Sequence, residues 1–436
     1  MSENRDTSPA GAAHDTHRSA PGAQHCFLAL DLGTTTLVGR LLAADGTVLA
    51  EERLANPQRP LGADILTRLQ RARDGAADAL QHLLQDGMRT LVTTLLGRAG
   101  VAPERIAGAA AAGNPGICHL LCRLPVDALI HPPHRSPLTA LSSLPAAAAD
   151  LGLPVPLQLF PAVSGFVGGD LVAVLYGLAT QRLALSTQHC LVLDLGTNAE
   201  LALRAGGRWL VTSAAAGPAF EAGNIACGMP LAPGAVTGVQ LAADRLLLEV
   251  HGGGRPAGLC GSGLLALIAA ARQGGLIDAG GRIVAPEEVG TNLARYLVRD
   301  GAGWAVRFHR DAGLELRLTQ DDVRQLQLAK GAVRAGIDVL LGRAGLDAGE
   351  VAAVLITGAF GAALPAAALK GIAMLPEGMV DNSFFVPNGV LDGLGAFLAD
   401  PGGAERLAPL LTAIRPLPLS GTPAFEKRFL AALEFA

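Results

Sequence analysis

Two stretches of the chain share the tetrapeptide Asp-Leu-Gly-Thr: FLALDLGTTTLVGRLL at residues 27–42 and HCLVLDLGTNAELALRAG at residues 189–206. In both, one short apolar run precedes the tetrapeptide and another follows it. This pattern predicts a strand, a tight turn at the glycine and a second strand, with an acid and hydroxyls held at the turn. A single such turn is equally typical of an ordinary hairpin with a capping Asp, so the repetition needs independent support.

A longer repeat supplies that support. LLGRAGVAPERIAGAAAAGNPG at residues 95–116 and LLGRAGLDAGEVAAVLITGAFG at residues 340–361 open with the same six residues and reach a Gly-x-x-Gly at the same distance. Both predict a helix that ends on a glycine, a short loop, a buried strand and a glycine turn into another helix. Chance repetition in an Ala-rich and Gly-rich chain does not easily produce this ordered match.

The two repeats together predict a duplicated α/β fold. Each half begins with an Asp-Leu-Gly-Thr hairpin and a third strand, and later reaches the helix–strand–glycine unit. We expect a first subdomain over residues 26–185 and a second over residues 186–436. The second is longer by roughly 80 residues, which we assign to an insertion at about 213–318. Residues 1–25 are polar and are expected to form a disordered leader.

Composition excludes several classes of function. A net charge of −4 over 436 residues gives no electrostatic case for binding nucleic acid or an anionic membrane. The leader lacks the apolar core of a signal peptide, and no segment is long and apolar enough to span a membrane, so we expect a cytoplasmic protein. The six cysteines show neither a C-x-x-C pair nor a ferredoxin pattern. Cys118 and Cys122 would share one helical face, where reduced cysteines usually act as small buried hydrophobes.

The two turns, taken as a pair, predict a site for phosphates. A glycine turn can aim backbone N–H groups at an anion, and neighbouring hydroxyls add donors. Asp31 and Asp194, at the strand ends, are the expected Mg²⁺ ligands, because Mg²⁺ commonly binds one or two carboxylates together with substrate phosphates. Glu200, just beyond the second turn, is a candidate for orienting an attacking water. The remaining turn residues expected to hold phosphates are Gly33, Thr34, Thr35, Thr36, Gly196, Thr197 and Asn198.

This paired arrangement resembles the actin-like ATPase superfamily of acetate and sugar kinases, Hsp70 and actin. The resemblance implies a ribonuclease H-like two-subdomain fold with mixed sheets flanked by helices and ATP in the cleft between the subdomains. LITGAFGAAL at residues 355–364 is similar to the superfamily's adenosine-binding turn, which implies nucleotide contacts from Gly358, Ala359, Phe360 and Gly361, with Phe360 expected to pack rather than stack on the base.

Two further segments are ambiguous. TQDDVRQLQLAKGAVRAG at residues 319–336 predicts a helix with Thr319 as N-cap. Its Gln327 and Lys330 resemble the superfamily's nucleoside-contacting helix, although a solvated helix face explains them equally well. The loop GPAFEAGNIACG at residues 217–228 carries one acid, Glu221. It lies either beside the γ-phosphate or at a partner surface, or it is plain connecting structure.

A closer resemblance is to the ATPase domain of the reductive activators of corrinoid enzymes, and it covers nearly everything from Cys26 onward. It rests on long motifs: NPQRPLGADILTRL (56–69), AAGNPGICHLLCRLPVDAL (111–129), PAVSGFVGGDLVAVLYG (161–177), TSAAAGPAFEAGNIACGM (212–229), GLCGSGLLALI (258–268) and FVPNGVLDGLGAFL (385–398). The resemblance implies an ATPase that drives reduction of a Co(II) corrinoid protein to Co(I). Because the usual ferredoxin-like cysteine pattern is absent, the electron would come from a separate ferredoxin-like donor.

Other functions remain open from the sequence. A small-molecule kinase of the same superfamily would need a catalytic base, for which Asp170 is the candidate. An ATP-dependent assembly or scaffold protein would need only the nucleotide site. The activator of 2-hydroxyacyl-CoA dehydratases also resembles this chain, and there Cys118 and Cys122 would have to supply half of a cluster shared across a dimer. The sequence does not choose between a monomer and a homodimer.

Overall fold

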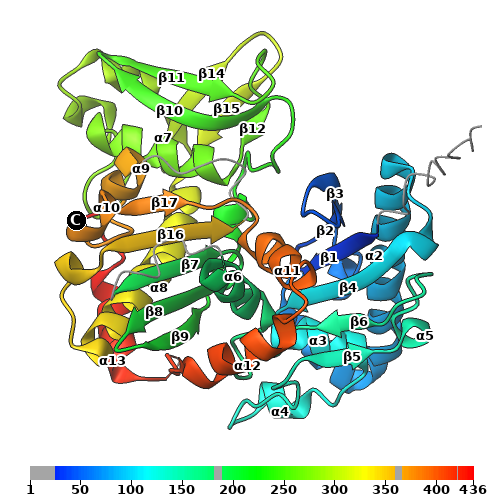
Figure 1. Ribbon diagram of the computed structural model, residues 1–436. Coiled ribbons are helices and arrows are strands. Elements are labelled where there is room, and N and C mark those ends of the chain that lie inside the picture. Colours follow the sequence, from blue (N-terminus) through cyan, green and yellow to red (C-terminus); the bar gives the residue numbers. More distant parts are fainter. Residues whose placement is uncertain (1–24, 181–188, 359–365, 420) are drawn as a thin grey trace, which may run out of the picture.

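A computed structural model describes residues 25–180, 189–358, 366–419 and 421–436. Each half of the chain builds one six-stranded mixed sheet flanked by helices, and the two sheets stand side by side (Figure 1). The predicted α/β class and the duplicated frame are therefore confirmed.

The first sheet has the strand order β3-β2-β1-β4-β6-β5. The first three strands form an antiparallel meander, whereas β4 and β6 run parallel to β1. Along the long helix that follows the meander, Leu84, Met88, Leu91 and Leu95 recur at helical spacing and are buried against the sheet. The elements are β1 (Cys26–Leu32), β2 (Thr36–Ala43), β3 (Val48–Ala55), α1 (Ile65–Arg71), α2 (Ala77–Ala99), β4 (Ile106–Gly113), α3 (Pro115–Cys122), α4 (Asp127–Ile130), β5 (Ser142–Leu144), α5 (Ala146–Ala149) and β6 (Leu157–Leu159).

The second sheet has the order β17-β16-β7-β8-β9-β18 and repeats this plan. Strands β7, β8 and β9 form the meander, and β16 and β17 add in parallel beyond β7, as β4 and β6 do beyond β1. The strands are β7 (Cys190–Leu195), β8 (Ala199–Ala205), β9 (Arg208–Ala214), β16 (Ala353–Gly358), β17 (Ser383–Phe385) and β18 (Ile414–Pro416). Its helices are α8 (Gln320–Ala344), α9 (Ala366–Gly371), α10 (Glu377–Val380), α12 (Gly403–Ala413) and α13 (Pro423–Ala431).

The helix ends follow the sequence signals. Helix α2 ends at Gly100 with φ 63° and α8 ends at Gly345 with φ 68°, so both copies of LLGRAG close on a left-handed glycine. At the start of α8, the Thr319 side chain accepts from the Asp322 N–H and the Asp322 carboxylate accepts from the Thr319 N–H. This is the capping box expected from TQDD.

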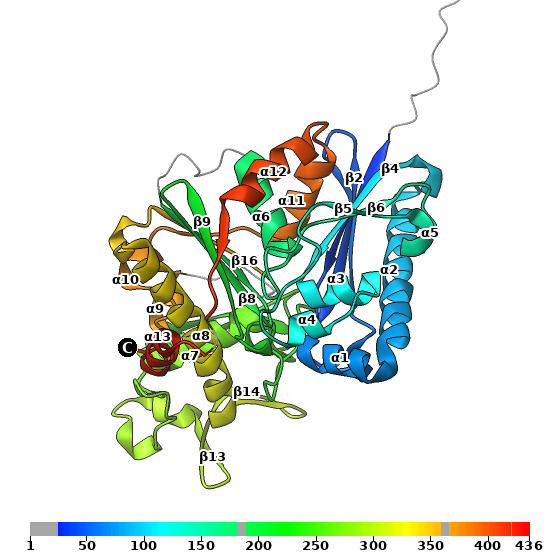
Figure 2. The ribbon, with the colours of Figure 1, turned by 90° about the horizontal axis from the view of Figure 1, so that it is seen from below.

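Two helices, α6 (Gly169–Thr180) and α11 (Gly389–Leu398), form a layer between the sheets (Figures 1 and 2). They pack on each other, and one apolar core joins them to the facing sides of both sheets. The helices cross at glycines: a Cβ on Gly393 would lie 1.8 Å from the Ala173 carbonyl oxygen, and one on Gly177 would lie 2.9 Å from the Gly393 Cα. The absence of side chains there sets how closely the two halves approach.

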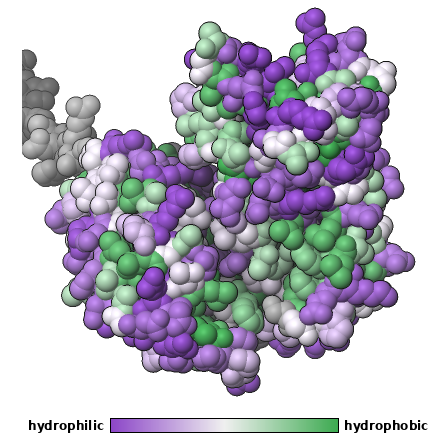
Figure 3. All heavy atoms as spheres, turned by 180° about the vertical axis from the view of Figure 1, so that it is seen from behind, coloured by the Kyte–Doolittle hydropathy of each residue, from purple (hydrophilic) through white to green (hydrophobic). Residues whose placement is uncertain are grey.

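Residues 235–318 form a separate layer on the second half. Two three-stranded sheets and α7 (Gly261–Gln273) project at the top of Figure 1. Hydrophilic side chains dominate this projection in the view from behind (Figure 3). Its strands are β10 (Ala235–Ala242), β11 (Arg245–Val250), β12 (Gly258–Leu259), β13 (Leu297–Asp300), β14 (Gly303–Arg310) and β15 (Glu315–Leu318). None of the described helices is long and apolar enough to cross a membrane.

Candidate active site between the two sheets

The two Asp-Leu-Gly-Thr turns meet across the boundary between the sheets. The hydroxyls of Thr35 and Thr197 lie 3.3 Å apart, although 162 residues separate them in sequence. A Cβ on Gly33 would lie 2.5 Å from the Thr36 carbonyl oxygen, so the bend itself requires glycine. At Gly196 a Cβ would meet nothing closer than 3.4 Å. A Cβ at Gly196 would make only ordinary contacts, so the second turn does not require glycine on steric grounds.

Neighbouring side chains hold the turns in place. The Asn56 amide donates to the Gly33 carbonyl at 2.9 Å, and the Asn114 amide donates to the Thr34 hydroxyl at 3.0 Å. Asn114 also caps α3 by accepting from a backbone N–H of its first turn at 3.0 Å. In the second turn, the Glu221 carboxylate accepts from the backbone N–H of Thr197 at 2.9 Å and from its hydroxyl at 3.0 Å. Glu221 thus lies beside the second turn.

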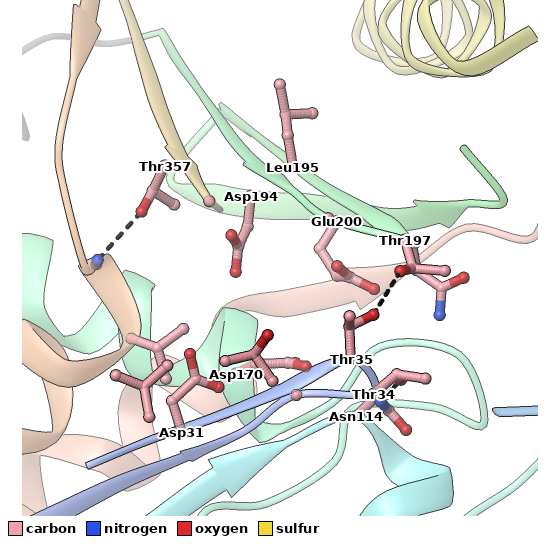
Figure 4. A pocket seen from close by; sticks show the side chains of 18 of the residues that line it. Asp31, Thr34, Thr35, Asn114, Asp170, Asp194, Leu195, Thr197, Glu200 and Thr357 are labelled. Atoms are coloured by element: carbon pink, nitrogen blue, oxygen red, sulfur yellow. Dashed lines mark hydrogen bonds between the residues drawn. The ribbon is translucent and has the colours of Figure 1, made fainter. Parts of the chain in front are cut away.

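Four further acids line the same pocket. Asp31 and Asp194 occupy equivalent positions near the ends of β1 and β7 and face each other across the pocket, with Asp170 and Glu200 nearby (Figure 4). Asp31 comes from the first sheet and Asp194 from the second. Glu200 is buried and accepts from the Ser213 hydroxyl at 3.0 Å. The pocket is therefore strongly acidic.

This crowding changes how the acids titrate. Burial, and after it the nearby Asp194 charge, raises the pKa of Asp31 well above its usual range. Burial, followed by Asp170 and Glu221, raises the pKa of Asp194 to about 7, and burial raises the pKa of Asp170 to about 6. The pKa of Glu200 is also raised well above its usual range by burial and then by Asp170 and Asp194. A cation in the pocket would relieve this repulsion.

The donor set fits a cation carried by a phosphate ligand rather than a protein-only metal cage. No group of three or more His, Cys, Asp or Glu side chains in the described ranges is arranged to hold a metal ion by itself. Mg²⁺ differs from most structural metals because it keeps several waters and needs only one or two carboxylates plus phosphate oxygens. Asp31 and Asp194 satisfy that requirement.

The pocket gathers most of the residues predicted from the sequence. Besides the two aspartates and Glu200, the predicted residues along its wall are Gly33, Thr34, Thr35, Thr36, Gly196, Thr197, Asn198 and Gly358. Ala359, Phe360 and Gly361 lie outside the described residues. Sequence reasoning had not assigned Arg53, Asn114, Thr357 or Asn388 to the site, although each lines the pocket.

Gln327 and Lys330 lie elsewhere. Both are buried on α8 and hold the C-terminal segment of residues 433–435. The Gln327 amide donates to the Leu433 carbonyl at 2.8 Å, and the Lys330 ammonium donates to the Glu434 carbonyl and lies 5.1 Å from the Phe435 ring. Neither residue lines the pocket, so the open alternative of a solvated helix face does not describe them. Their contact with a nucleoside stays a prediction.

The cysteines give no sign of a cluster. Cys118 is buried and Cys122 is partly buried, and both are free thiols. Burial raises the pKa of both thiols, which disfavours the thiolate form that binds iron.

Two sheets that share the order of five strands, a shared helical layer and paired glycine turns over an acidic pocket define an actin-like, two-lobed domain of the ASKHA type. The chain belongs to the RACo family. The family model described as the C-terminal domain of RACo, the ASKHA domain, matches residues 188–436, and the model of the RACo middle region matches residues 26–182.

Two curated relatives and one solved structure extend this result. The corrinoid activation enzyme RamQ of Eubacterium limosum is 29% identical over 373 residues, covering 80% of this chain and 60% of RamQ. The [Co(II) methylated amine-specific corrinoid protein] reductase of Methanosarcina barkeri is 28% identical over 238 residues, covering 50% of this chain and 39% of the reductase. A reductive activator for corrinoid, iron–sulfur protein matches with a TM-score of 0.86 and 26% identity over 95% of this chain and 67% of that chain. The chain thus spans less than two thirds of the length of each of the two curated relatives.

Proposed function

We propose that this chain binds ATP with Mg²⁺ between its two sheets, hydrolyses it, and uses the resulting change of shape to drive reduction of a Co(II) corrinoid protein. The observation that carries the nucleotide assignment is the 3.3 Å contact between the Thr35 and Thr197 hydroxyls. It brings two phosphate-type turns from separate sheets to one point, with an acid at the end of each preceding strand. RamQ and the M. barkeri reductase, by their names, support the corrinoid assignment.

Each group has a defined task in this proposal. Asp31 and Asp194 hold hydrated Mg²⁺, which neutralises phosphate charge when bound. The turn N–H groups and hydroxyls orient the phosphates from both sides. Glu200 orients the attacking water, for which it must be ionised. The positive charge of Mg²⁺ would lower the pKa of a nearby carboxyl and so oppose the rise that burial and the neighbouring acids cause in the pKa of Glu200.

The redox step balances with a separate donor. One molecule of ATP and one of water give ADP and phosphate, while a low-potential, ferredoxin-like protein loses one electron and the Co(II) centre gains it to become Co(I). ATP does not carry the electron; its binding or hydrolysis changes the relative position of the two lobes and remodels the partner complex. The proposal places the protein in the cytoplasm, where ATP is available, and leaves a homodimer as a further arrangement to test.

The test measures phosphate release and corrinoid reduction together. The full chain is mixed with Mg·ATP, a Co(II) corrinoid protein and Ti(III) citrate as the one-electron donor, and Co(I) is followed by its visible absorption. We expect ATP turnover to rise with the corrinoid protein and Co(I) to form only with ATP. Asp31→Asn should abolish both, whereas Asp45→Asn, at an exposed acid in the turn between β2 and β3, should change neither. Turnover stimulated by a small metabolite instead would indicate a kinase.

A further inference from the structure

The pocket contains a single basic side chain among its described lining residues. Arg53, near the end of β3, lines it together with Asp31, Asp170, Asp194, Glu200 and Glu221. A polyphosphate entering this acidic pocket needs positive charge in addition to that of Mg²⁺. Arg53 is the protein group placed to supply it.

Arg53 has fewer close carboxylate partners than its neighbour Arg40. Arg40 is buried and forms ion pairs with two carboxylates, Glu51 at 2.8 Å and Asp392 at 2.6 Å. The Arg53 side chain is 52% exposed. It donates to the neutral amide oxygen of Asn388 at 2.7 Å and lies 3.6 Å from Glu51. A guanidinium has five donors, and a phosphate is a stronger acceptor than an amide.

The partner of Arg53 sits at a junction between the two lobes. Asn388 immediately precedes α11 and has a φ of 55°, in the left-handed region. The next residue, Gly389, donates its N–H to the Thr357 hydroxyl at 3.1 Å, near the end of β16. The start of α11 is therefore held to the first sheet through Arg53 and through the Arg40–Asp392 ion pair, and to the second sheet through Thr357. Release of the Arg53 contact would remove one of the two ties to the first sheet.

We propose that Arg53 binds the terminal phosphate of ATP and exchanges its hydrogen bond to Asn388 for one to that phosphate, so that the start of α11 responds to ATP but not to ADP. This inference rests on the proposed function only in that the pocket binds a nucleotide. It makes Arg53 a sensor of the third phosphate and Asn388 the group that passes the signal to the helix between the lobes.

The first test measures dissociation constants for ADP and for a non-hydrolysable ATP analogue by calorimetry. Arg53→Gln should raise the constant for the ATP analogue roughly tenfold and change that for ADP less than about threefold, because only the third phosphate loses a charge-assisted partner. Arg53→Lys should recover part of the affinity through charge without the planar fork. Arg98→Gln, which removes an exposed arginine paired with Glu52 beside the same strand, is the matched control and should change neither constant.

The second test follows hydrogen exchange of the α11 amides. In the natural protein the ATP analogue, and not ADP, should speed exchange in the first turn of α11. Asn388→Gly keeps the left-handed backbone and removes the acceptor. It should bind the ATP analogue at least as tightly while losing this response. If Arg53→Gln binds both nucleotides like the natural protein, the sensor role is wrong. If the natural protein binds neither nucleotide, the proposed function itself fails.

Discussion

Replacement of Asp194 by asparagine should stabilise the ligand-free protein while removing its Mg·ATP turnover. Asp194 lines the pocket with Asp31, Asp170, Glu200 and Glu221, and no basic side chain forms an ion pair with Asp194 among the described residues. The ionised form is therefore disfavoured by burial and by like charges. Asparagine has nearly the same shape and carries no charge.

The magnitude follows from the titration of Asp194. A pKa of about 7, against an ordinary 3.8, corresponds to a penalty of about 4 kcal/mol once the group is ionised in the folded state. The Asp194 carboxylate retains some solvent contact in the pocket, and solvent screening weakens the penalty. We therefore expect Asp194→Asn to raise the free energy of unfolding by about 2 kcal/mol at pH 8. Because the pKa is raised in the folded state, stability of the natural protein is lost as pH rises from about 4 to about 7. At pH 5 the increase in the free energy of unfolding caused by Asp194→Asn should therefore fall below about 1 kcal/mol.

The assay compares unfolding midpoints in urea at pH 5 and pH 8 for the natural protein, Asp194→Asn and a control. Asp127→Asn, at an exposed position on α4, measures the effect of losing one negative charge elsewhere. The expected result is a stability gain for Asp194→Asn that is larger at pH 8, with almost no change for the control. An equal gain at both pH values, or a loss at pH 8, would refute the like-charge explanation.

Three other substitutions test the framework around the site. Gly393→Ala should lower the melting temperature, because the new Cβ would lie 1.8 Å from the Ala173 carbonyl oxygen and overpacking costs about 1–3 kcal/mol. The control Gly97→Ala should not lower it, because a Cβ there meets nothing within 4 Å. Asn114→Ala should cost about 0.5–2 kcal/mol as a lost helix cap and should weaken nucleotide binding in calorimetry. Lys330→Met should stabilise the protein most below pH 7 and progressively less toward pH 10, because burial lowers the pKa of this lysine to about 7.

The parts of the fold that could be predicted are those with local signals. The glycine hairpins, the left-handed caps at Gly100 and Gly345 and the Thr319 capping box each depend on a few adjacent residues, and all were predicted correctly. The internal repeat added the long-range information that one half of the chain would look like the other. It also predicted that the two acids would occupy equivalent strand ends.

The residues that could not be predicted owe their positions to chain segments far away in sequence. Arg53 and Asn388 are 335 residues apart, and neither has a flanking pattern that would show that they meet. The α8 periodicity identifies one face of a helix but not what covers it. Gln327 and Lys330 are buried because residues 433–435 fold back onto that face. The spacing of apolar residues along a helix cannot reveal which distant segment of the chain packs against it.

The geometry of the two turns also bears on how a nucleotide would move the lobes. If the Thr197 hydroxyl gave up its hydrogen bond to Glu221, a phosphate oxygen accepting from both the Thr35 and Thr197 hydroxyls at about 2.7 Å each would hold them about 4.4 Å apart at a tetrahedral angle. The two hydroxyls are 3.3 Å apart in the structure. To grip a phosphate in this way, the turns would have to separate slightly. The close crossing of α6 and α11 at Gly393 leaves no room for the lobes to approach there. The movement would therefore be a rotation about that crossing. Because Arg53 and Thr357 hold the start of α11, such a rotation would change these two contacts.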